Sequence, residues 1–247
     1  MLLRRVTEHL RSQNWTGVVL DLAIVILGIF LGLQASQWYQ NRQELGLEIS
    51  ILERLREDFT AIAAGAESAI QFHQEQIVVL EGMQNTLRAG KADSEADVLF
   101  RTGLSDAMGY HLGPGRSGTY VEILSSGRFR LLRSPELRKA LSAYDDSVRK
   151  ADYLFSVFQQ SQRKYETAFN RHFTRGPSKS FEVDSLSSGV MYAHGEIVEF
   201  DFESMTDDGA FTAAIGRLLE YHINYQFWHS NISRSANRVL KSLESLE

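Results

Sequence analysis

The sequence predicts an all-α protein, with one N-terminal transmembrane helix that continues into an antiparallel helical bundle with a short β-like insertion. Three observations support this fold class. One long apolar run occupies residues 16–38. Beyond it, apolar residues recur at intervals of three and four, which is the period of a helix. Proline occurs only 3 times, and each proline falls between two helical patterns.

The apolar run, Thr16 to Trp38, is long enough to cross a membrane. As a helix it extends about 36 Å, whereas the hydrocarbon core of a bilayer is about 30 Å thick. Trp15 and Trp38 bracket the run, and tryptophan favours the interface between lipid and water. We therefore expect a transmembrane helix over residues 16–38.

Residues 1–15 form a basic, amphipathic head, in which Arg4, Arg5 and Arg11 are opposed only by Glu8. Over a similar length after the run, acids outnumber bases. Basic flanks stay in the cytoplasm, so we expect the N-terminus inside and residues 39–247 outside. The run is too long for a cleaved signal peptide and lacks its small-residue exit, which favours a permanent anchor.

Gly28, Gly32 and Ser36 lie four residues apart and form a face of small side chains within the span. Such faces allow two membrane helices to approach closely, and Gln34 could add a hydrogen bond between them. We expect helix association here. The alternative is that glycine is simply common in membrane helices.

Asp21 is an acid inside the apolar run. A carboxylate in lipid is costly. The side chain should therefore reach the interface, stay protonated, face a partner helix, or handle ions or protons.

The amino-acid composition argues against some classes of partner and of chemistry. The net charge is -5 and the basic head makes the remainder more acidic still, which argues against nucleic acid and against polybasic docking to anionic lipid. The chain has no cysteine, which excludes disulfides and thiolate chemistry. Roughly 210 residues follow the span, enough for one well-cored domain.

Periodicity and capping residues divide this exterior part into helices. Ala89-Gly90 ends the first helix, Gly127 stops a short one, Ser134-Pro135 begins a long one, and Thr206-Asp207-Asp208 caps the last. Gly46, Gly65 and Gly82 could mark bends in the first helix. A Gly-rich stretch over residues 109–118 reads as a connector. The expected helices cover residues 40–88, 94–108, 120–126, 135–175 and 209–247.

Residues 180–204 are the least helical part and are expected to form a strand or loop insertion. Within it, Val198, Phe200 and Phe202 alternate with acidic residues, which predicts a half-buried strand. The acidic row could bind calcium, but no calcium-loop spacing accompanies it, so a solvated face is favoured.

Four histidines, His73, His172, His222 and His229, fall at inward-facing positions on three predicted helices. Helical bundles build metal and haem sites from such positions. No metal-binding or haem-attachment motif accompanies them, so polar residues that set helix register are the favoured explanation. We expect no metal and no cofactor. No nucleophile elbow, paired carboxylates or cofactor fingerprint is present, so we expect no enzymatic activity.

Two stretches resemble a family of uncharacterised bacterial single-pass membrane proteins, a domain of unknown function. The first runs from Asp21 through Gly28-Ile29 to Leu33-Gln34-Ala35-Ser36-Gln37-Trp38, which matches an N-terminal span ending in a Leu-Gln-x-x-x-Trp motif. The second comprises residues 120–127, residues 131–137 and Tyr144. The resemblance implies a bacterial inner membrane and a periplasmic domain, and it carries no catalytic residues.

Three hypotheses follow. The first is a non-enzymatic membrane-anchored scaffold or accessory subunit, whose partners are itself or another inner-membrane protein together with membrane lipid. The second is an ion-flow-coupled, stator-like small subunit that uses Asp21. The third is a periplasmic ligand sensor that acts through a partner.

Overall fold

The computed structural model describes residues 15–111, 115–177 and 195–246, apart from the side chains of residues 15–18 and 21. The chain divides into two units, Met1–Ile51 and Leu52–Glu247. The predicted head, residues 1–15, and the predicted insertion, residues 180–204, fall largely outside the described residues.

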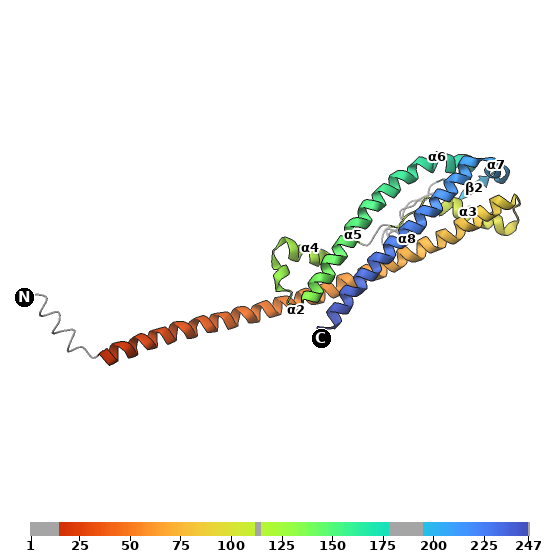
Figure 1. Cartoon of the computed structure of the whole chain (residues 1–247). Coiled ribbons are helices and arrows are strands. Elements are labelled where there is room, and N and C mark those ends of the chain that lie inside the picture. The colour runs from red at the N-terminus through yellow and green to blue at the C-terminus, as the bar shows by residue number, and fades with distance from the viewer. Residues whose placement is uncertain (1–14, 112–114, 178–194, 247) are drawn as a thin grey trace, which may run out of the picture. The chain divides into compact units, whose positions relative to one another are not determined.

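Helices dominate the described residues, and a single antiparallel pair of strands accompanies them there (Figure 1), which confirms a helical fold with a small β element. The helices are α2 (Trp15–Ala89), α3 (Ser94–Asp106), α4 (Gly118–Ser125), α5 (Pro135–Gln162), α6 (Glu166–Phe169), α7 (Phe202–Asp207) and α8 (Gly209–Glu244). The short 3-10 helices are η1 (Arg128–Leu131), η2 (Arg163–Tyr165) and η3 (Asn170–His172). The strands are β1 (Phe173–Arg175) and β2 (Ile197–Phe200).

In the first unit, α2 carries the apolar run. Its large apolar side chains from Val19 to Leu33 are exposed. By length and composition, α2 is the one described helix that could cross a membrane.

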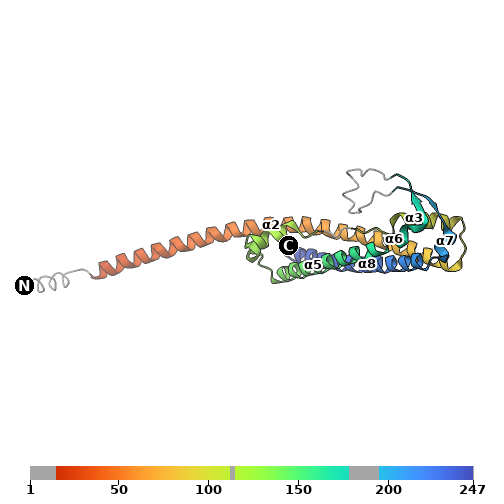
Figure 2. The same ribbon diagram turned by 90° about the horizontal axis from the view of Figure 1, so that it is seen from above.

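In the second unit, three long helices lie side by side: α2 from Leu52 onward, α5 and α8 (Figures 1 and 2). Each buries residues at alternating steps of three and four, the spacing of a coiled-coil seam. On α8 the buried seam is Phe211, Ile215, Leu218, His222, Tyr225, His229, Ile232, Ala236, Val239 and Leu243.

The direction of the three helices departs partly from the predicted antiparallel arrangement. Helix α8 is antiparallel to α2, since His222 contacts His73 while the earlier Gly216 lies beside the later Gln84. It is also antiparallel to α5, since Ser235 contacts Ser147 while Tyr221 contacts Phe158. Helices α2 and α5 run in the same direction, because α3 and the following connector return the chain to the first turns of the domain. There Ser117 donates a hydrogen bond to Asp58 at 2.7 Å.

The predicted helix boundaries are confirmed where capping residues specify them. The Ser134 hydroxyl accepts a hydrogen bond from the Leu137 N–H at 3.1 Å, with Pro135 as the first helical residue. Gly90 and Gly127 have φ of 65° and 69°. These left-handed conformations suit glycine and end α2 and α4.

Helix α5 ends at Gln162, so the prediction of one helix over residues 135–175 is wrong. The remaining residues form η2, α6, η3 and β1. In the paired strand, Ile197 is buried while Val198 is 63% exposed, and Phe202 already belongs to α7. The alternation thus located β2 and correctly predicted that Phe200 and Phe202 pack against the core, but it was wrong for Val198, because Ile197 takes the buried position.

Helix α2 is continuous through Gly46, Gly65 and Gly82. Gly82 instead permits close packing. A Cβ atom placed on it would lie 2.9 Å from Cδ2 of Leu99, so the missing side chain lets α3 approach α2.

Candidate functional site: a buried histidine cluster

The domain brings four histidines together in its interior. His73 comes from α2, His222 and His229 come from α8, and His111 comes from the connector after α3. His73, His222 and His229 are completely buried, and His111 is 6% exposed. Ring centroids are 5.1 Å apart for His73 and His222, 5.4 Å for His73 and His229, and 6.2 Å for His111 and His229. We call these four residues the histidine cluster.

Seam spacing explains how the sequence places these rings. His73 follows Ala69 by four residues at a buried position of α2, and His222 and His229 occupy buried positions two turns apart on α8. Tyr225 lies between the two α8 histidines on the same seam. The same residues would form an ordinary apolar core if they were leucines.

Hydrogen bonds fix which nitrogen of two neutral rings carries the proton. Nε2 of His222 lies 2.9 Å from the carbonyl oxygen of Ala107, which can only accept, so Nε2 must donate. Nδ1 of His222 is then the acceptor from Nδ1 of His73, at 2.9 Å. His73 therefore carries its proton on Nδ1, and its Nε2 presents a lone pair.

Several buried polar atoms of this layer have no hydrogen-bond partner among the described residues. Each such atom costs about 1–3 kcal/mol relative to its hydrated state. These atoms are Nε2 of His73, both ring nitrogens of His229, the hydroxyl of Tyr225 and Oε1 of Gln76.

Burial favours the neutral form of His73, His222 and His229. Desolvation lowers the pKa of His222 to about 4, although the hydrogen bond to Ala107 opposes part of this shift. Desolvation, followed by the proximity of His111, also lowers the pKa of His229 to about 4, although the backbone of His111 opposes part of this shift. The pKa of His73 is lowered as well, first by burial and then by the neighbouring His222, His229 and His111.

Aromatic side chains pack directly on the imidazoles. The ring of Tyr225 stacks on His73 at 5.0 Å with an interplanar angle of 11°. Phe155 of α5 lies 5.0 Å from Tyr225 and 4.9 Å from His229. All three long helices therefore meet at the histidine cluster.

His172 does not join the other three predicted histidines. It lies in η3, with Nε2 2.8 Å from Oδ2 of Asp208, the N-cap residue of α8. This contact is the main reason why the pKa of Asp208 is lowered to about 2. His172 is separated from the cluster because α5 ends before it and the following short segments pack at the other end of the domain.

Within the described ranges, no three histidine, aspartate or glutamate side chains are arranged to hold a metal ion. The ring nitrogens of His73 and His222 that face each other share a hydrogen bond instead. The cluster resists protonation, because burial lowers the pKa of His73, His222 and His229, so protonating them in acid would cost folding free energy.

The residues singled out in the apolar run lie on α2. Apart from the backbone of their own helix turn, Gly28 and Gly32 have no described atom within 4 Å of the position that a Cβ would take. Ser36 and Gln34 are exposed on the same helix. For Asp21 only the backbone is described, and it is helical.

Sequence reasoning missed His111. Its neighbours are glycine-rich and have no periodicity, so the stretch read as a connector. A signal was present nonetheless, because Tyr110 and His111 are an aromatic pair within an otherwise small and polar loop. Tyr110 stacks on Tyr225 at 6.4 Å, so this loop contributes to the same buried layer.

The chain matches no protein-family model, no curated protein and no solved structure. The resemblance to uncharacterised bacterial single-pass membrane proteins therefore stays a prediction. The functional argument depends on the chain's own residues.

Proposed function

We propose that this protein is a non-enzymatic, membrane-anchored interaction module of the bacterial inner membrane. In this proposal α2 crosses the membrane with the N-terminus in the cytoplasm, and the second unit is a periplasmic helical domain. The protein serves as an accessory or scaffold subunit of an inner-membrane assembly, or as a homo-oligomer.

One observation carries the proposal: the exposed apolar surface of α2. Its large apolar side chains between Val19 and Leu33 are 56% to 63% exposed. A contiguous apolar surface of this extent is rare on a soluble monomer and marks a surface for lipid or for a partner. Lipid accounts for the whole circumference of the helix, because the apolar residues face every direction.

Gly28 and Gly32 support association within the membrane. A Cβ atom at either position would have no described atom within 4 Å, apart from the backbone of its own helix turn. Packing within the described monomer therefore does not require glycine at these positions. Four-residue spacing places both glycines on one helical face, where a second helix could approach.

The first test is membrane integration and orientation. We expect full-length protein to stay in the membrane fraction at alkaline pH. Reporter fusions should place residues after Trp38 in the periplasm. Release at alkaline pH, or a cytoplasmic C-terminus, would contradict the proposal.

The second test is the size and composition of the complex purified in mild detergent. Gly28→Ile/Gly32→Ile should dissociate a homo-oligomer without affecting insertion, because isoleucine suits a membrane helix and has room in the monomer. Ala23→Ile/Phe30→Ile is the matched control, since at about 100° per residue these positions lie on the opposite face. If wild type is monomeric and co-purifies with no partner, the interaction module is ruled out.

A ligand sensor is the second candidate, and the histidine cluster favours it. Nε2 of His73 and both ring nitrogens of His229 are buried polar groups without partners, as in ligand pockets with a few convergent polar atoms. A ligand that used them should raise the melting temperature of wild type and not of His229→Leu. An equal rise in both proteins would remove this candidate.

A further inference from the structure

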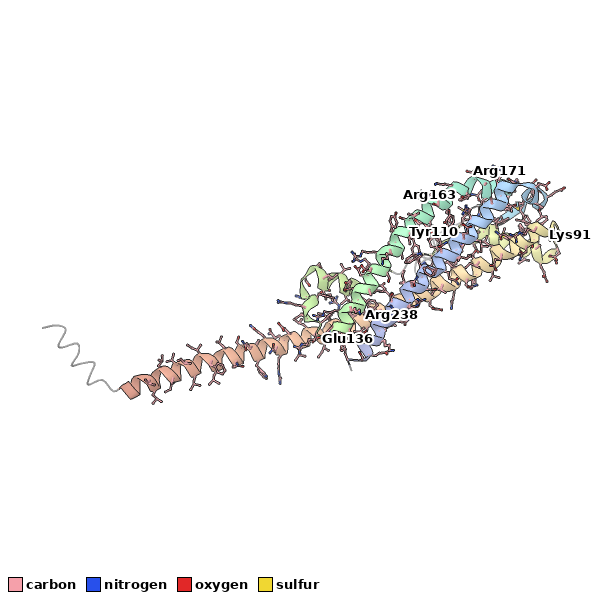
Figure 3. The ribbon with its side chains drawn as sticks, viewed as in Figure 1. Lys91, Tyr110, Glu136, Arg163, Arg171 and Arg238 are labelled. Carbon is pink, nitrogen blue, oxygen red and sulfur yellow. The ribbon has the colours of Figure 1, made fainter. Side chains whose placement is uncertain are left out.

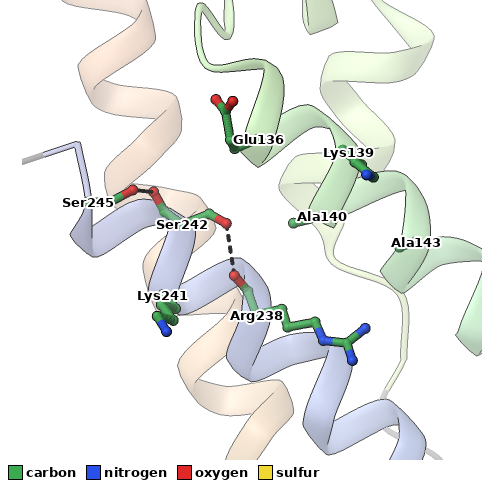
Figure 4. Close-up of a pocket in the computed structure, with 8 residues that line it drawn as sticks. All are labelled: Glu136, Lys139, Ala140, Ala143, Arg238, Lys241, Ser242 and Ser245. Carbon is green, nitrogen blue, oxygen red and sulfur yellow. Dashed lines mark hydrogen bonds between the residues drawn. The ribbon is translucent and has the colours of Figure 1, made fainter.

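An open groove lies between the first turns of α5 and the last turns of α8 (Figure 4). Its volume is about 470 Å³, within the range of pockets that hold small ligands. Its lining is Glu136, Lys139, Ala140, Ala143, Arg238, Lys241, Ser242 and Ser245.

The groove is cationic. Lys139, Arg238 and Lys241 are exposed, and none of them forms an ion pair with another described residue. Glu136 is the single acid in the lining. Unpaired cations around a concave surface create a positive potential that attracts an anionic ligand.

The other lining groups carry no charge that could bind an anion, and the two serine hydroxyls already donate hydrogen bonds at the end of α8. The Ser242 hydroxyl donates to the carbonyl oxygen of Arg238 at 2.9 Å, and the Ser245 hydroxyl donates to that of Ser242 at 2.8 Å (Figure 4). Ala140, together with the aliphatic stem of Lys139, provides apolar surface. The groove therefore suits a ligand with an anionic group beside an apolar one.

The stretch that begins α5, beside the groove, is rich in basic residues. Figure 3 shows Arg238 and Glu136 near each other at one end, and Lys91 and Arg171 at the opposite end. Within residues 128–139 five bases accompany Glu136, although the whole chain has a net charge of -5. The negative net charge of the whole chain argued against docking to anionic lipid. That net charge does not reflect the local excess of positive charge in residues 128–139.

The chain enters the domain at the same end. Phe59 of α2 packs edge-on against Tyr144 of α5 at 4.7 Å, next to the groove residue Ala143. About 14 residues separate Trp38 from Leu52, and a chain of that length spans at most about 50 Å in any conformation. A membrane anchor would therefore keep lipid headgroups at a high effective concentration around this domain.

We infer that the groove between α5 and α8 binds the headgroup of an anionic phospholipid, with its phosphate held by Lys139, Arg238 and Lys241. The inference rests on the proposed membrane anchoring. Lipid is the chosen occupant because it combines a phosphate with an apolar part and because the anchor supplies it. The role of the groove is to hold one end of the domain to the membrane surface.

The test uses the full chain in mild detergent with equal amounts of phosphatidylglycerol and phosphatidylcholine that carry the same acyl chains. Native mass spectrometry counts the lipids retained. Wild type should prefer phosphatidylglycerol at least about tenfold, since each basic residue near an anionic lipid surface contributes roughly fivefold in affinity. Lys139→Glu/Arg238→Glu/Lys241→Glu should lose this preference.

The matched control is Lys91→Glu/Arg163→Glu/Lys164→Glu. It changes the net charge by the same amount, and Lys91 and Arg163 lie away from the groove (Figure 3). The control should retain the preference. Glu136→Gln removes the single lining acid, so it should strengthen retention about twofold without a charge reversal. This second variant keeps the test decisive if the triple reversal does not fold.

Three outcomes overturn the inference. If the triple reversal keeps the preference, the arginines of residues 1–15 are responsible rather than the groove. If millimolar inorganic phosphate displaces the lipid completely, the groove is a site for a free anion. If an acidic protein co-purifies and is lost in the triple reversal while lipid preference stays, the groove is a protein interface. Lipid counting in detergent does not depend on membrane insertion. A failure of the proposed anchoring is therefore distinguishable from a failure of lipid binding by the groove.

Discussion

Two regions of the same bundle show opposite ways of filling a helical seam. Where α3, α7 and the start of α8 pack on the end of α2, the core contains apolar side chains such as Leu80, Phe100, Phe211 and Leu218. One turn further along α8, beginning at His222, the seam becomes the histidine cluster. Both regions are buried, so the difference lies in the chemistry of the side chains and not in the packing geometry.

The comparison separates stability from specificity. Apolar side chains gain free energy on burial and tolerate small shifts of one helix along another. The imidazoles lose hydration, and only one register brings Nδ1 of His73 to Nδ1 of His222. Gln74 and Gln226 form a second cross-helix hydrogen bond in the same register. The apolar region therefore stabilises the domain, while the histidine cluster selects the register and responds to pH.

The largest expected effect is loss of stability in acid. The folded-state pKa of His222 and of His229 lies near 4, below the ordinary value of 6.5. The unfolded chain therefore binds protons first, and stability is complete above about pH 6.5 and falls toward pH 4. Between pH 7 and pH 5 the loss is about 4 kcal/mol for these two residues, and more with His73. Chemical unfolding of the full chain, followed by circular dichroism, measures it.

The control is a triple replacement, His73→Leu/His222→Leu/His229→Leu. It should show little pH dependence in the same window, because leucine does not titrate. Equal slopes for wild type and this variant would mean that the histidines are hydrated, which contradicts their burial.

The next prediction concerns a side chain of the apolar region. Phe211 is completely buried and stacks on Phe169 at 6.0 Å. Phe211→Ala should lower the free energy of unfolding by about 3–5 kcal/mol. Phe227→Ala, at a 57% exposed position of the same helix, should change it by at most about 0.5 kcal/mol. Similar losses in both variants would show that α8 packs with a different face inward.

The next prediction exchanges residue types between the two regions, with leucine placed in the histidine cluster and histidine placed in the apolar region. His229→Leu removes a ring with two unpartnered nitrogens and should stabilise the domain by about 1–2 kcal/mol at neutral pH. Leu218→His places an imidazole in the apolar region and should cost about 3 kcal/mol. Thermal unfolding of both variants beside wild type tests the pair. Destabilisation by His229→Leu would indicate that His229 is satisfied by a bound group.

The smallest effect concerns the hydroxyl of Tyr225, which is buried without a partner among the residues described. Tyr225→Phe keeps the stacking on His73 and should raise stability by about 1 kcal/mol or less. It should leave the acid dependence unchanged, since burial raises the pKa of this hydroxyl and it does not titrate in acid. A changed slope between pH 7 and pH 5 would couple Tyr225 to the histidines.

Regular features of the sequence predicted regular features of the structure. The last helix was predicted to follow Asp208, and α8 begins at Gly209 with Asp208 as its N-cap. Ser134-Pro135 and Gly127 set helix ends because their conformational preferences act locally. Such preferences need no knowledge of the rest of the fold.

The parts that sequence reasoning missed depend on long-range contacts. Periodicity placed His73, His222 and His229 on inward faces, but it could not show that they meet, because that depends on the register between α2 and α8. His111 arrives from a segment without periodicity. The parallel direction of α2 and α5 depends on the return path of the connector. Val198 faces solvent because Ile197, one residue earlier, takes the buried position.

The partnership of α2 with α8 has a consequence for synthesis. His73 and His222 are 149 residues apart in the chain, so the seam of α2 cannot close until most of α8 has been made. At about 5–20 residues per second, the ribosome needs roughly 7 to 30 s for that stretch. Throughout this interval the apolar face of α2 lacks α8, although α3 and α5 are already available to pack on it. Part of the α2 seam therefore stays exposed for longer than it would in a protein whose helix pairs are neighbours in sequence.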